Sequence, residues 1–338
     1  MFFNLIIIIV YLTISLKFIV ELTFIPSIII YYFFPKLKQY INIFKNVIWS
    51  NISFITYMLL FKNIYIDSNE LVDEIQSNTD KPNIIISNHL IDLDFLIHNI
   101  IFSNTSLNSI NIGVAKKLVG YQIPICGFYG MLTGDIFLHR KIEMDIHKLN
   151  KKIKFNNLLI FPEGTCFTKD RKIISDNYCD KNKLIKFNYH LYPRMTGITT
   201  IIQSNNNVKY IYDITIIYDN IDKKGYGHHY TFYSYIYNLH PFPNKVFIKI
   251  NKYKINNDKI EKQIEKIFYH KDKFVKEFNC SNNKFIPIKY NYFKGFGCFI
   301  GTNLLTIFSI WLFIKFTFVK YLYLSEYIIY LIYFYFFV

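Results

Sequence analysis

Cysteine is scarce in this chain, and its few cysteines form no recognisable framework. They stand at five of the 338 positions, Cys126, Cys166, Cys179, Cys280 and Cys298. Their spacing matches neither a metal-binding motif nor a disulfide pattern, so we predict free thiols, and neither a structural zinc nor a cysteine nucleophile can be argued from them. The chain also lacks a Gly-x-Ser-x-Gly motif, which marks the nucleophilic serine of many hydrolases.

Acidic residues are in the minority as well. Asp and Glu number 24 against 39 Lys and Arg, which gives a formal net charge of +15. A basic chain can bind nucleic acid, but we find no zinc finger, RNP-type motif or basic helix, and the basic residues are scattered between apolar runs. We therefore expect no nucleic-acid partner, and favour an anionic membrane surface or phosphate-bearing substrates.

Long apolar runs, in contrast, occur at both ends of the chain, and hydrophobic residues make up 52% of it. Residues 1–34 are almost continuously apolar, and residues 43–61 form a weaker apolar segment. We therefore predict N-terminal membrane-anchoring helices in residues 1–61, which either span the bilayer or lie in its interface. The alternative for residues 43–61 is a buried helix of the globular domain. Residues 296–338 predict one or two C-terminal transmembrane segments.

The middle of the chain, residues 62–290, has a different pattern of apolar and polar residues. Short apolar runs alternate with polar stretches there, which is typical of an α/β fold with a central, mostly parallel sheet flanked by helices. The predicted strands are 83–87, 111–115, 135–139, 157–161, 191–202 and 208–217, and the predicted helices include 89–102 and 141–154. Residues 251–279 place apolar residues at helical intervals among Lys and Glu, which predicts an amphipathic helix.

Two predicted strands end in polar loops, within IIISNHLIDLDFL (84–96) and LLIFPEGT (158–165). Ligands of open α/β sheets bind at the carboxyl ends of strands. The first loop carries His89, and an imidazole held by a carboxylate can act as a general base. Inside an ideal helix His89 would share a face with Asp92. If His89 instead precedes the first helical turn, its ring can reach Asp94, so spacing leaves both partners open.

Four sequence blocks resemble the glycerolipid acyltransferases, the family of the lysophosphatidic acid acyltransferases. The first block is Asn88-His89 followed, after four residues, by Asp94. Three further blocks follow in the family's order, GDIFLHR (134–140), FPEGT (161–165) and LYPRMTG (191–197). The last has the form seen in the branch that includes lysocardiolipin acyltransferases.

The resemblance implies an enzyme that transfers an acyl group from acyl-coenzyme A to a lysophospholipid. The expected acceptor is 1-acylglycerol-3-phosphate, which would give phosphatidic acid. One alternative is the remodelling of another lysophospholipid such as lysocardiolipin, and a more distant one is a membrane-bound thioesterase. His89 would be the base and Asp94 would orient it. The acceptor would attack the thioester directly, without an acyl-enzyme, a metal or any cofactor besides the co-substrate acyl-coenzyme A. The implied setting is an integral protein of the endoplasmic reticulum or another endomembrane, with the catalytic domain in residues 62–290.

The resemblance also predicts substrate-binding residues in the later blocks. Arg140 would clamp a phosphate, because a guanidinium binds phosphate bidentately, and Lys116 would add a second positive charge. Glu163 would hydrogen-bond the acceptor or order its loop, while Gly164 would let backbone amides approach a ligand. The full predicted set is Arg140, Lys116, Glu163, Gly164, Thr165 and Arg194.

One position departs from the family pattern. Cys166 follows FPEGT, where many members carry an arginine. If that arginine binds phosphate in those members, Arg140, Lys116, Lys169 or Arg171 must compensate in this chain. The residues therefore predict the type of reaction better than the head group of the acceptor.

Overall fold

The structure is a computed structural model that describes most of residues 33–315. The gaps within this range are residues 62, 78–81, 103–110, 117–129, 131–134, 140, 151–156, 206, 220–242 and 280–283. The predicted membrane segments in residues 1–32 and 316–338 lie outside the described residues.

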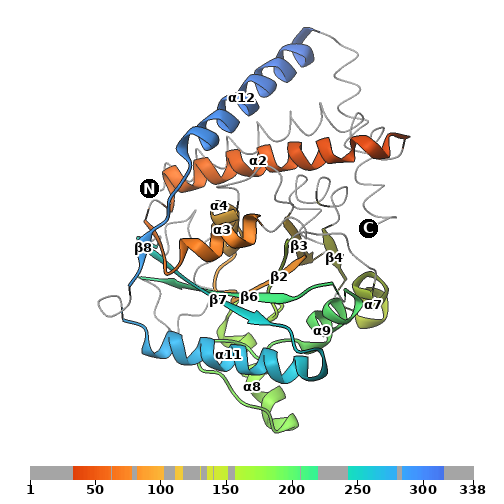
Figure 1. The fold of residues 1–338 in the computed structure, drawn as a ribbon, viewed down its shortest axis with the longest axis vertical. Helices are drawn as coiled ribbons and strands as arrows, with labels where there is room; N and C mark the ends of the chain where they lie inside the picture. Colours follow the sequence, from red (N-terminus) through yellow and green to blue (C-terminus); the bar gives the residue numbers. More distant parts are fainter. Residues whose placement is uncertain are drawn as a thin grey trace.

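The described residues form an eight-stranded sheet (Figure 1). Its strands are β1 (Ile64–Ile66), β2 (Asn83–Ser87), β3 (Asn111–Lys116), β4 (Ile136–Leu138), β5 (Asn157–Ile160), β6 (Tyr210–Tyr218), β7 (Val246–Lys254) and β8 (Ile286–Pro287). From edge to edge the order is β4-β3-β5-β2-β6-β7-β1-β8. The strands run parallel from β4 to β6 and between β7 and β1, and antiparallel in the pairs β6–β7 and β1–β8. The predicted α/β class with a mostly parallel sheet is confirmed.

Helices cover both faces of this sheet. The α-helices of the described residues are α2 (Lys38–Leu59), α3 (Asn69–Ser77), α4 (Asp94–Phe102), α7 (Ile142–Asn150), α8 (Lys169–Asn182), α9 (Met195–Ser204), α11 (Ile260–Glu277) and α12 (Tyr292–Lys315). Helices α2, α3 and α4 lie over one face, and α9 and α11 lie over the other (Figure 1).

Strand β2 runs through the buried centre of the sheet, and each of its residues is buried. Its side chains alternate between two apolar clusters. Ile85 packs with α2 and α4, whereas Ile84 and Ile86 pack with α9 and α11. Because helices cover both faces, the strand is apolar along its whole length. The polar residues after Ser87 therefore follow a strand at the centre of the sheet.

The prediction of a strand at residues 191–202 is wrong. A loop comes first, and α9 begins at Met195. The β-branched run ITTII favours a strand by propensity. As a helix it instead buries Ile198, Ile201 and Ile202 on one face, in the apolar cluster that also contains Ile84 and Ile86 of β2. Packing against the sheet outweighs the weak local propensity.

The amphipathic helix predicted for residues 251–279 is confirmed only in part. Helix α11 buries Ile260, Ile264, Ile267 and Phe268, as the pattern predicts. Residues 251–254, however, complete strand β7. Strands β1, β7 and β8 were not predicted, because short runs rich in Lys and Asn obscure their alternation.

Helix α2 contains much of the predicted membrane segment 43–61. Its residues Ile48, Ile52 and Ile55 are buried in the core that it shares with the sheet, and the helix also packs along α12 (Figure 1). This burial agrees with the alternative of a helix that belongs to the globular domain. A membrane role for residues 1–61 stays a prediction.

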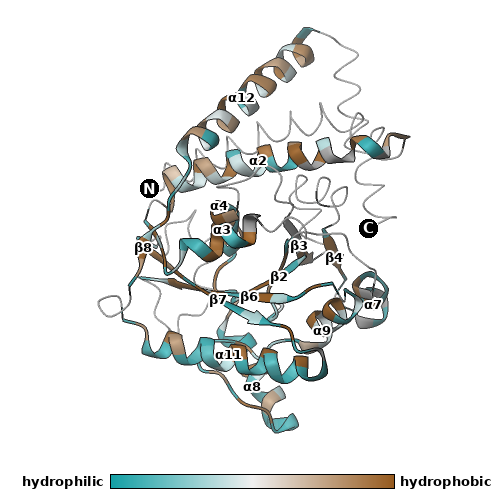
Figure 2. Ribbon diagram, viewed as in Figure 1, coloured by the Kyte–Doolittle hydropathy of each residue, from teal (hydrophilic) through white to brown (hydrophobic). Residues whose placement is uncertain are grey.

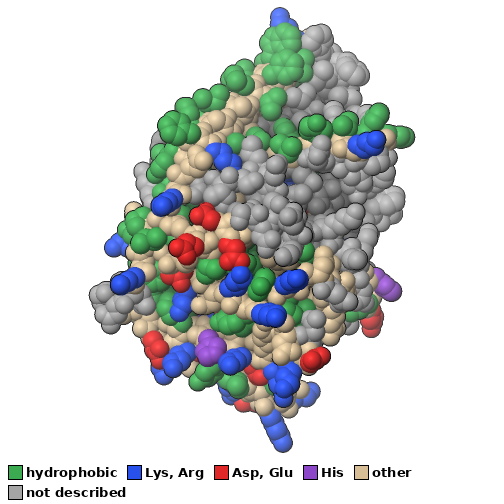
Figure 3. Space-filling model, viewed as in Figure 1, with side chains coloured by type: hydrophobic (Ala, Val, Ile, Leu, Met, Phe, Trp, Pro, Cys, Tyr) green, Lys and Arg blue, Asp and Glu red, His purple; other side chains and the backbone are tan. Residues whose placement is uncertain are grey.

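Helix α12 is the one helix among the described residues that is long and apolar enough to cross a membrane. It is apolar along most of its length (Figure 2), and large side chains such as Phe296, Leu304, Ile307 and Trp311 are exposed on it. Charged side chains lie mostly over the rest of the visible face, from α3 to α8 and α11 (Figure 3). The predicted C-terminal segment therefore starts as a helix at Tyr292, four residues before position 296.

Candidate active site

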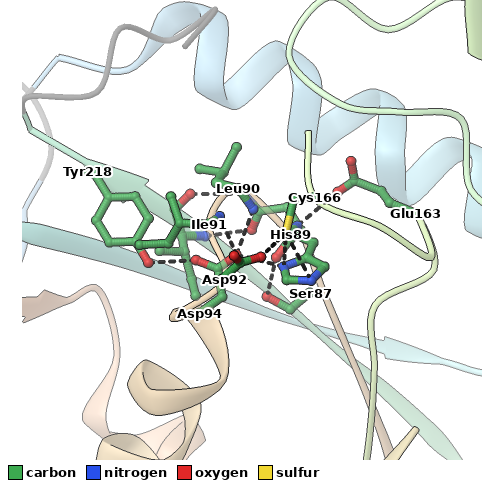
Figure 4. Close-up of polar contacts among 11 residues, drawn as sticks. Ser87, His89, Leu90, Ile91, Asp92, Asp94, Glu163, Cys166 and Tyr218 are labelled. Atoms are coloured by element: carbon green, nitrogen blue, oxygen red, sulfur yellow. Dashed lines mark hydrogen bonds and ion pairs between the residues drawn. The ribbon is translucent and has the colours of Figure 1, made fainter. Parts of the chain in front are cut away.

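His89 lies in the loop between β2 and α4, at the carboxyl edge of the sheet. Because α4 begins only at Asp94, His89 precedes the helix, and its ring folds back toward the helix start. Its Nδ1 lies 3.0 Å from Asp94 Oδ2 (Figure 4). Asp92 is exposed and makes no such contact with the ring among the described interactions. The structure therefore pairs His89 with Asp94.

Asp94 is buried, and hydrogen bonds reach both oxygens of its carboxylate. Oδ2 accepts from the backbone N–H groups of Leu90 at 2.6 Å and Ile91 at 3.0 Å, besides facing the ring of His89. Oδ1 accepts from the hydroxyl of Tyr218 at 2.6 Å. The carboxylate is thus fixed in position, which is what orienting a histidine requires.

The pairing with Asp94 assigns different roles to the two ring nitrogens of His89. A carboxylate accepts hydrogen bonds, so the proton of the neutral ring resides on Nδ1 and the lone pair on Nε2. The ring also stacks on Phe161, with 4.5 Å between the centroids. Its side chain is 21% exposed. Nε2 is therefore the atom that can accept a proton from a bound substrate.

Asn88 ties the histidine loop to the neighbouring strand β6. Its Nδ2 donates to the carbonyl oxygen of Ile216 at 2.9 Å, and its Oδ1 accepts from the N–H of Ile216 at 2.8 Å. The side chain thereby replaces one step of the backbone ladder just where β2 ends. These two hydrogen bonds explain why an asparagine stands before His89.

Glu163 ties the same loop to the segment before α9. Its side chain is buried, Oε1 accepts from the N–H of His89 at 3.0 Å, and Oε2 accepts from the N–H of Leu191 at 2.9 Å. Burial raises the pKa of this carboxyl, although the positive field of His190 and the two N–H donors oppose the rise. Of its two predicted roles, these contacts describe the ordering of the loop. Contact with an acceptor stays a prediction.

Gly164 and Arg194 lie against each other in the Pro-Glu-Gly-Thr turn. Gly164 has a φ of 71°, in the left-handed region that favours glycine. A Cβ at this position would lie 3.0 Å from Cδ and Nε of Arg194. The N–H of Arg194 also donates to the carbonyl of Pro162 at 2.8 Å. An exposed arginine from the fourth block is thus brought to the turn of the third block.

The remaining predicted substrate-binding residues are not gathered around His89 by any described contact. Thr165 is half-buried in the turn, but the helix that follows is capped by Thr168, whose Oγ1 accepts from the N–H of Arg171. Lys116 ends β3 opposite Leu138 of β4, and Arg140 lies outside the described residues. Phosphate binding by Arg140 and Lys116 stays a prediction. Among the described side chains, no three His, Cys, Asp or Glu residues gather as a metal site would require.

Sequence reasoning missed two buried histidines near this edge. His190 Nδ1 lies 3.1 Å from Asp272 Oδ1, and Asp272 also accepts from the backbone N–H groups of Asn188 and Tyr189. This pair fastens the segment before α9 to helix α11. His98 of α4 packs edge-on against Phe161, the ring on which His89 stacks, and burial lowers the pKa of His98 to about 3. No short motif marks these residues, because their partners are far away in the sequence.

Residues 69–219 match the family model described as Acyltransferase. The matched residues, called the acyltransferase domain after that model, make up somewhat less than half of the chain. The domain contains the His89–Asp94 pair, the Glu163 contacts, Arg194 and Tyr218. The family relationship predicted from the four blocks is therefore confirmed.

Curated relatives of this acyltransferase domain act on several lipids, according to their names. The chain is 32% identical over 146 residues to lysocardiolipin acyltransferase 1 of Gallus gallus. It is 31% identical over 161 residues to lysophosphatidylinositol acyltransferase 10 of Caenorhabditis elegans. It is 29% identical over 145 residues to 1-acyl-sn-glycerol-3-phosphate acyltransferase delta of Homo sapiens. These alignments include 40%, 43% and 40% of this chain, and 38%, 40% and 38% of the relatives.

The acyltransferase domain therefore aligns with well under half the length of these relatives. Among solved structures, the chain is similar to the 1-acyl-sn-glycerophosphate acyltransferase of Thermotoga maritima, with 14% identity and a TM-score of 0.41. That similarity covers 80% of this chain and 98% of the other.

Proposed function

We propose that this protein transfers a fatty acyl group from acyl-coenzyme A to the free hydroxyl of a lysophospholipid, with 1-acylglycerol-3-phosphate as the first candidate acceptor. One observation carries the proposal. The ring of His89 is held through Nδ1 by a buried carboxylate, so its Nε2 lone pair is available to a hydroxyl at the edge of the sheet. A base positioned in this way contributes roughly 10²- to 10⁴-fold to such reactions.

The role of each residue follows from this geometry. Nε2 of His89 would take the proton of the acceptor hydroxyl as that oxygen bonds to the acyl carbon. Asp94 would stabilise the imidazolium that forms and keep the ring oriented. The imidazolium would then return the proton to the sulfur that leaves the acyl carbon. Tyr218 would hold Asp94 from its other side.

The acceptor is supported less directly than the reaction. The names of the relatives include acyltransferases of lysocardiolipin, lysophosphatidylinositol and 1-acylglycerol-3-phosphate, and these acceptors share a phosphate beside the free hydroxyl. Arg194 is an exposed cation at the turn next to the His89 loop, and it would bind such a phosphate. Acylation of another lysophospholipid, such as lysocardiolipin, is therefore the alternative.

The proposed setting is a membrane of the endoplasmic reticulum or another endomembrane. Helix α12 offers a long apolar surface for it, and the formal net charge of +15 would attract the chain to anionic lipid. A lysophospholipid with one acyl chain would then reach the domain from the bilayer rather than from solution.

The test is acyl transfer by membranes that contain the protein. Labelled acyl-coenzyme A is supplied with lysophosphatidic acid, lysophosphatidylinositol or monolysocardiolipin in parallel, and the diacyl products are separated. We expect product with at least one acceptor, and loss of product in His89→Ala. The matched control is His147→Ala, because His147 is exposed on α7.

Two results would count against the proposal. Full transfer by His89→Ala would show that the ring is not the base. Release of free fatty acid at the same rate with and without saturating lysophospholipid would identify a thioesterase that uses water as its acceptor.

A further inference from the structure

A second pair of a histidine and a carboxylate lies between α11 and the segment before α9. His190 is 1% exposed, and its Nδ1 lies 3.1 Å from Oδ1 of Asp272. The same Oδ1 accepts from the N–H of Tyr189 at 2.7 Å, and Oδ2 accepts from the N–H of Asn188 at 3.0 Å. One carboxylate of α11 thus holds three consecutive residues of the chain.

The charge of Asp272 makes this a strong attachment. Burial alone would raise the pKa of its carboxyl, but the hydrogen bonds from His190 and from two backbone N–H groups keep that pKa below the ordinary value. A carboxylate only accepts hydrogen bonds, so Nδ1 of His190 carries a proton and donates it to Asp272. Hydrogen bonds to an ionised acceptor are stronger than those between neutral groups.

The residue after His190 connects this pair to the proposed base. The N–H of Leu191 donates to Oε2 of Glu163 at 2.9 Å, and Oε1 of the same carboxyl accepts from the N–H of His89 at 3.0 Å. Burial raises the pKa of Glu163 and the field of His190 opposes that rise, so the two side chains are close enough to interact. Contacts thus lead from α11 to the backbone of His89 through one buried carboxyl.

The same segment also carries the arginine proposed to bind phosphate. The N–H of Arg194 donates to the carbonyl oxygen of Pro162 at 2.8 Å, and the side chain of Arg194 lies against Gly164. The segment from residue 188 to residue 194 therefore meets the Pro-Glu-Gly-Thr turn at two points. Its attachment to α11 bears on the place of both the base and this arginine.

We propose that His190 is a positioning residue of the transfer reaction, which aligns His89 through Glu163. This inference rests on the proposed function and adds no chemical step to it. Because the ring of His190 is buried, it acts on the rate by where it holds the segment and not by contact with a substrate. A displacement of about 1 Å at a reacting group can cost roughly 10²-fold in rate.

The experiment measures transfer by the purified full chain in detergent. It uses acyl-coenzyme A and the acceptor that the wild type acylates fastest among lysophosphatidic acid, lysophosphatidylinositol and monolysocardiolipin. His190→Phe keeps a ring against Phe268 but has no donor for Asp272. We expect its kcat per folded molecule to fall roughly 10- to 100-fold, while its KM for acyl-coenzyme A stays the same.

The conservative variant His190→Asn should recover most of this rate. Its side-chain amide can donate to Asp272 from the place that Nδ1 occupies in the histidine. If His190→Phe does not fold, Asp272→Asn takes its place, because it weakens the same contact with little change in volume. The same fall in kcat is expected from it.

Two controls separate alignment from attachment and stability in general. Tyr192→Phe removes another bond between the segment and α11, the one from its hydroxyl to Oε1 of Glu265, and keeps the N–H bond to Ser175. Ile264→Val shortens a buried side chain of α11, which lowers stability without removing a hydrogen bond of the segment. Both variants should keep the kcat of the wild type per folded molecule.

The inference and the proposed function fail in different ways. A normal kcat per folded molecule in His190→Phe would overturn the inference and leave the pair with Asp272 as a purely structural contact. An equal loss in His190→Asn or in Ile264→Val would overturn it as well, because the donor to Asp272 would then not explain the rate. A wild type that acylates none of the three lysophospholipids would instead refute the proposed function.

Discussion

Tyr218 donates its hydroxyl hydrogen to Asp94 across a distance of 2.6 Å, on the carboxylate oxygen that does not face His89. The tyrosine ends β6, and Asp94 begins α4, so residues 124 positions apart meet at the carboxyl edge of the sheet. His89, Asp94 and Tyr218 therefore form a row of three side chains. They come from the loop after β2, from α4 and from β6.

This relationship predicts the effect of Tyr218→Phe. The substitution removes a hydrogen bond to a charged group, which is worth about 1.5–3 kcal/mol, while the ring keeps its packing. We expect lower thermal stability and roughly tenfold less acyl transfer, because Asp94 would hold His89 less firmly. Activity assays and thermal unfolding measure the two effects.

The control for this change is Tyr65→Phe in β1, where the ring stacks on Phe247 far from His89 along the sheet. It should leave transfer unchanged. Equal activity of Tyr218→Phe and the wild type would mean that the remaining donors to Asp94 suffice.

A second prediction concerns the left-handed turn at Gly164. In Gly164→Ala, the new Cβ would meet Arg194 at 3.0 Å, in a backbone region that costs roughly 1–2 kcal/mol for a residue with a side chain. We expect a lower melting temperature and weaker use of the phosphate-bearing acceptor, because the side chain of Arg194 must shift.

Gly197 provides the matched control for this glycine. It lies in α9, and an added Cβ there would meet nothing within 4 Å. Gly197→Ala should stabilise the helix by up to about 1 kcal/mol. Destabilisation of both variants by the same amount would contradict the specific role given to the turn at Gly164.

The third prediction is an acid sensitivity that originates at His98. This ring is buried, its nitrogens have no hydrogen-bond partner among the described residues, and its pKa is lowered to about 3 by burial and by the charges of Lys271 and His89. The unfolded chain binds a proton near the ordinary histidine pKa of about 6.5, so stability is complete above that pH and is lost as the pH falls toward 3.

His98→Phe should remove this loss while keeping a flat ring against Phe102 and Phe161. Between pH 8 and pH 5 we expect the wild type to lose about 2 kcal/mol more unfolding free energy than the variant. Denaturant unfolding at the two pH values measures the difference. An identical pH dependence in both proteins would place the acid sensitivity elsewhere.

How far the sequence predicts this molecule depends on the range of the contacts involved. The apolar run of β2 and the polar break after Ser87 are local, so they predict both the strand and the loop that carries His89. The choice of Asp94 over Asp92 needed the family resemblance, because it depends on where α4 begins. The contact of Tyr218 is invisible in sequence spacing, since it depends on β6 lying next to β2.

Two features that the sequence did not predict also depend on contacts between distant residues. The run ITTII predicts a strand by propensity, yet its place over the sheet makes it helix α9. Cys166 stands out in the sequence only as a departure from the family pattern. Its place beside the ring of His89 depends on the turn after β5 folding back onto that ring.

The last prediction separates the two roles that the sequence left open for Glu163. In Glu163→Gln, the amide keeps one acceptor oxygen, but its NH₂ group would face an N–H donor of His89 or Leu191. If Glu163 orders the loops, stability should fall by about 1–3 kcal/mol, and kcat should fall with it. If Glu163 binds the acceptor, KM should rise instead while the melting temperature stays the same.

The pH dependence of stability gives this test a second readout. Burial raises the pKa of Glu163, so the folded state holds its proton at a pH where the unfolded state has released it. The contribution of this group to the unfolding free energy therefore falls as the pH rises from the ordinary glutamate range through the raised pKa. Glu163→Gln should abolish that fall, whereas Glu261→Gln, at an exposed position of α11, should retain it. A fall that persists in Glu163→Gln would assign it to another acid, such as the half-buried Asp67, whose pKa is also raised by burial.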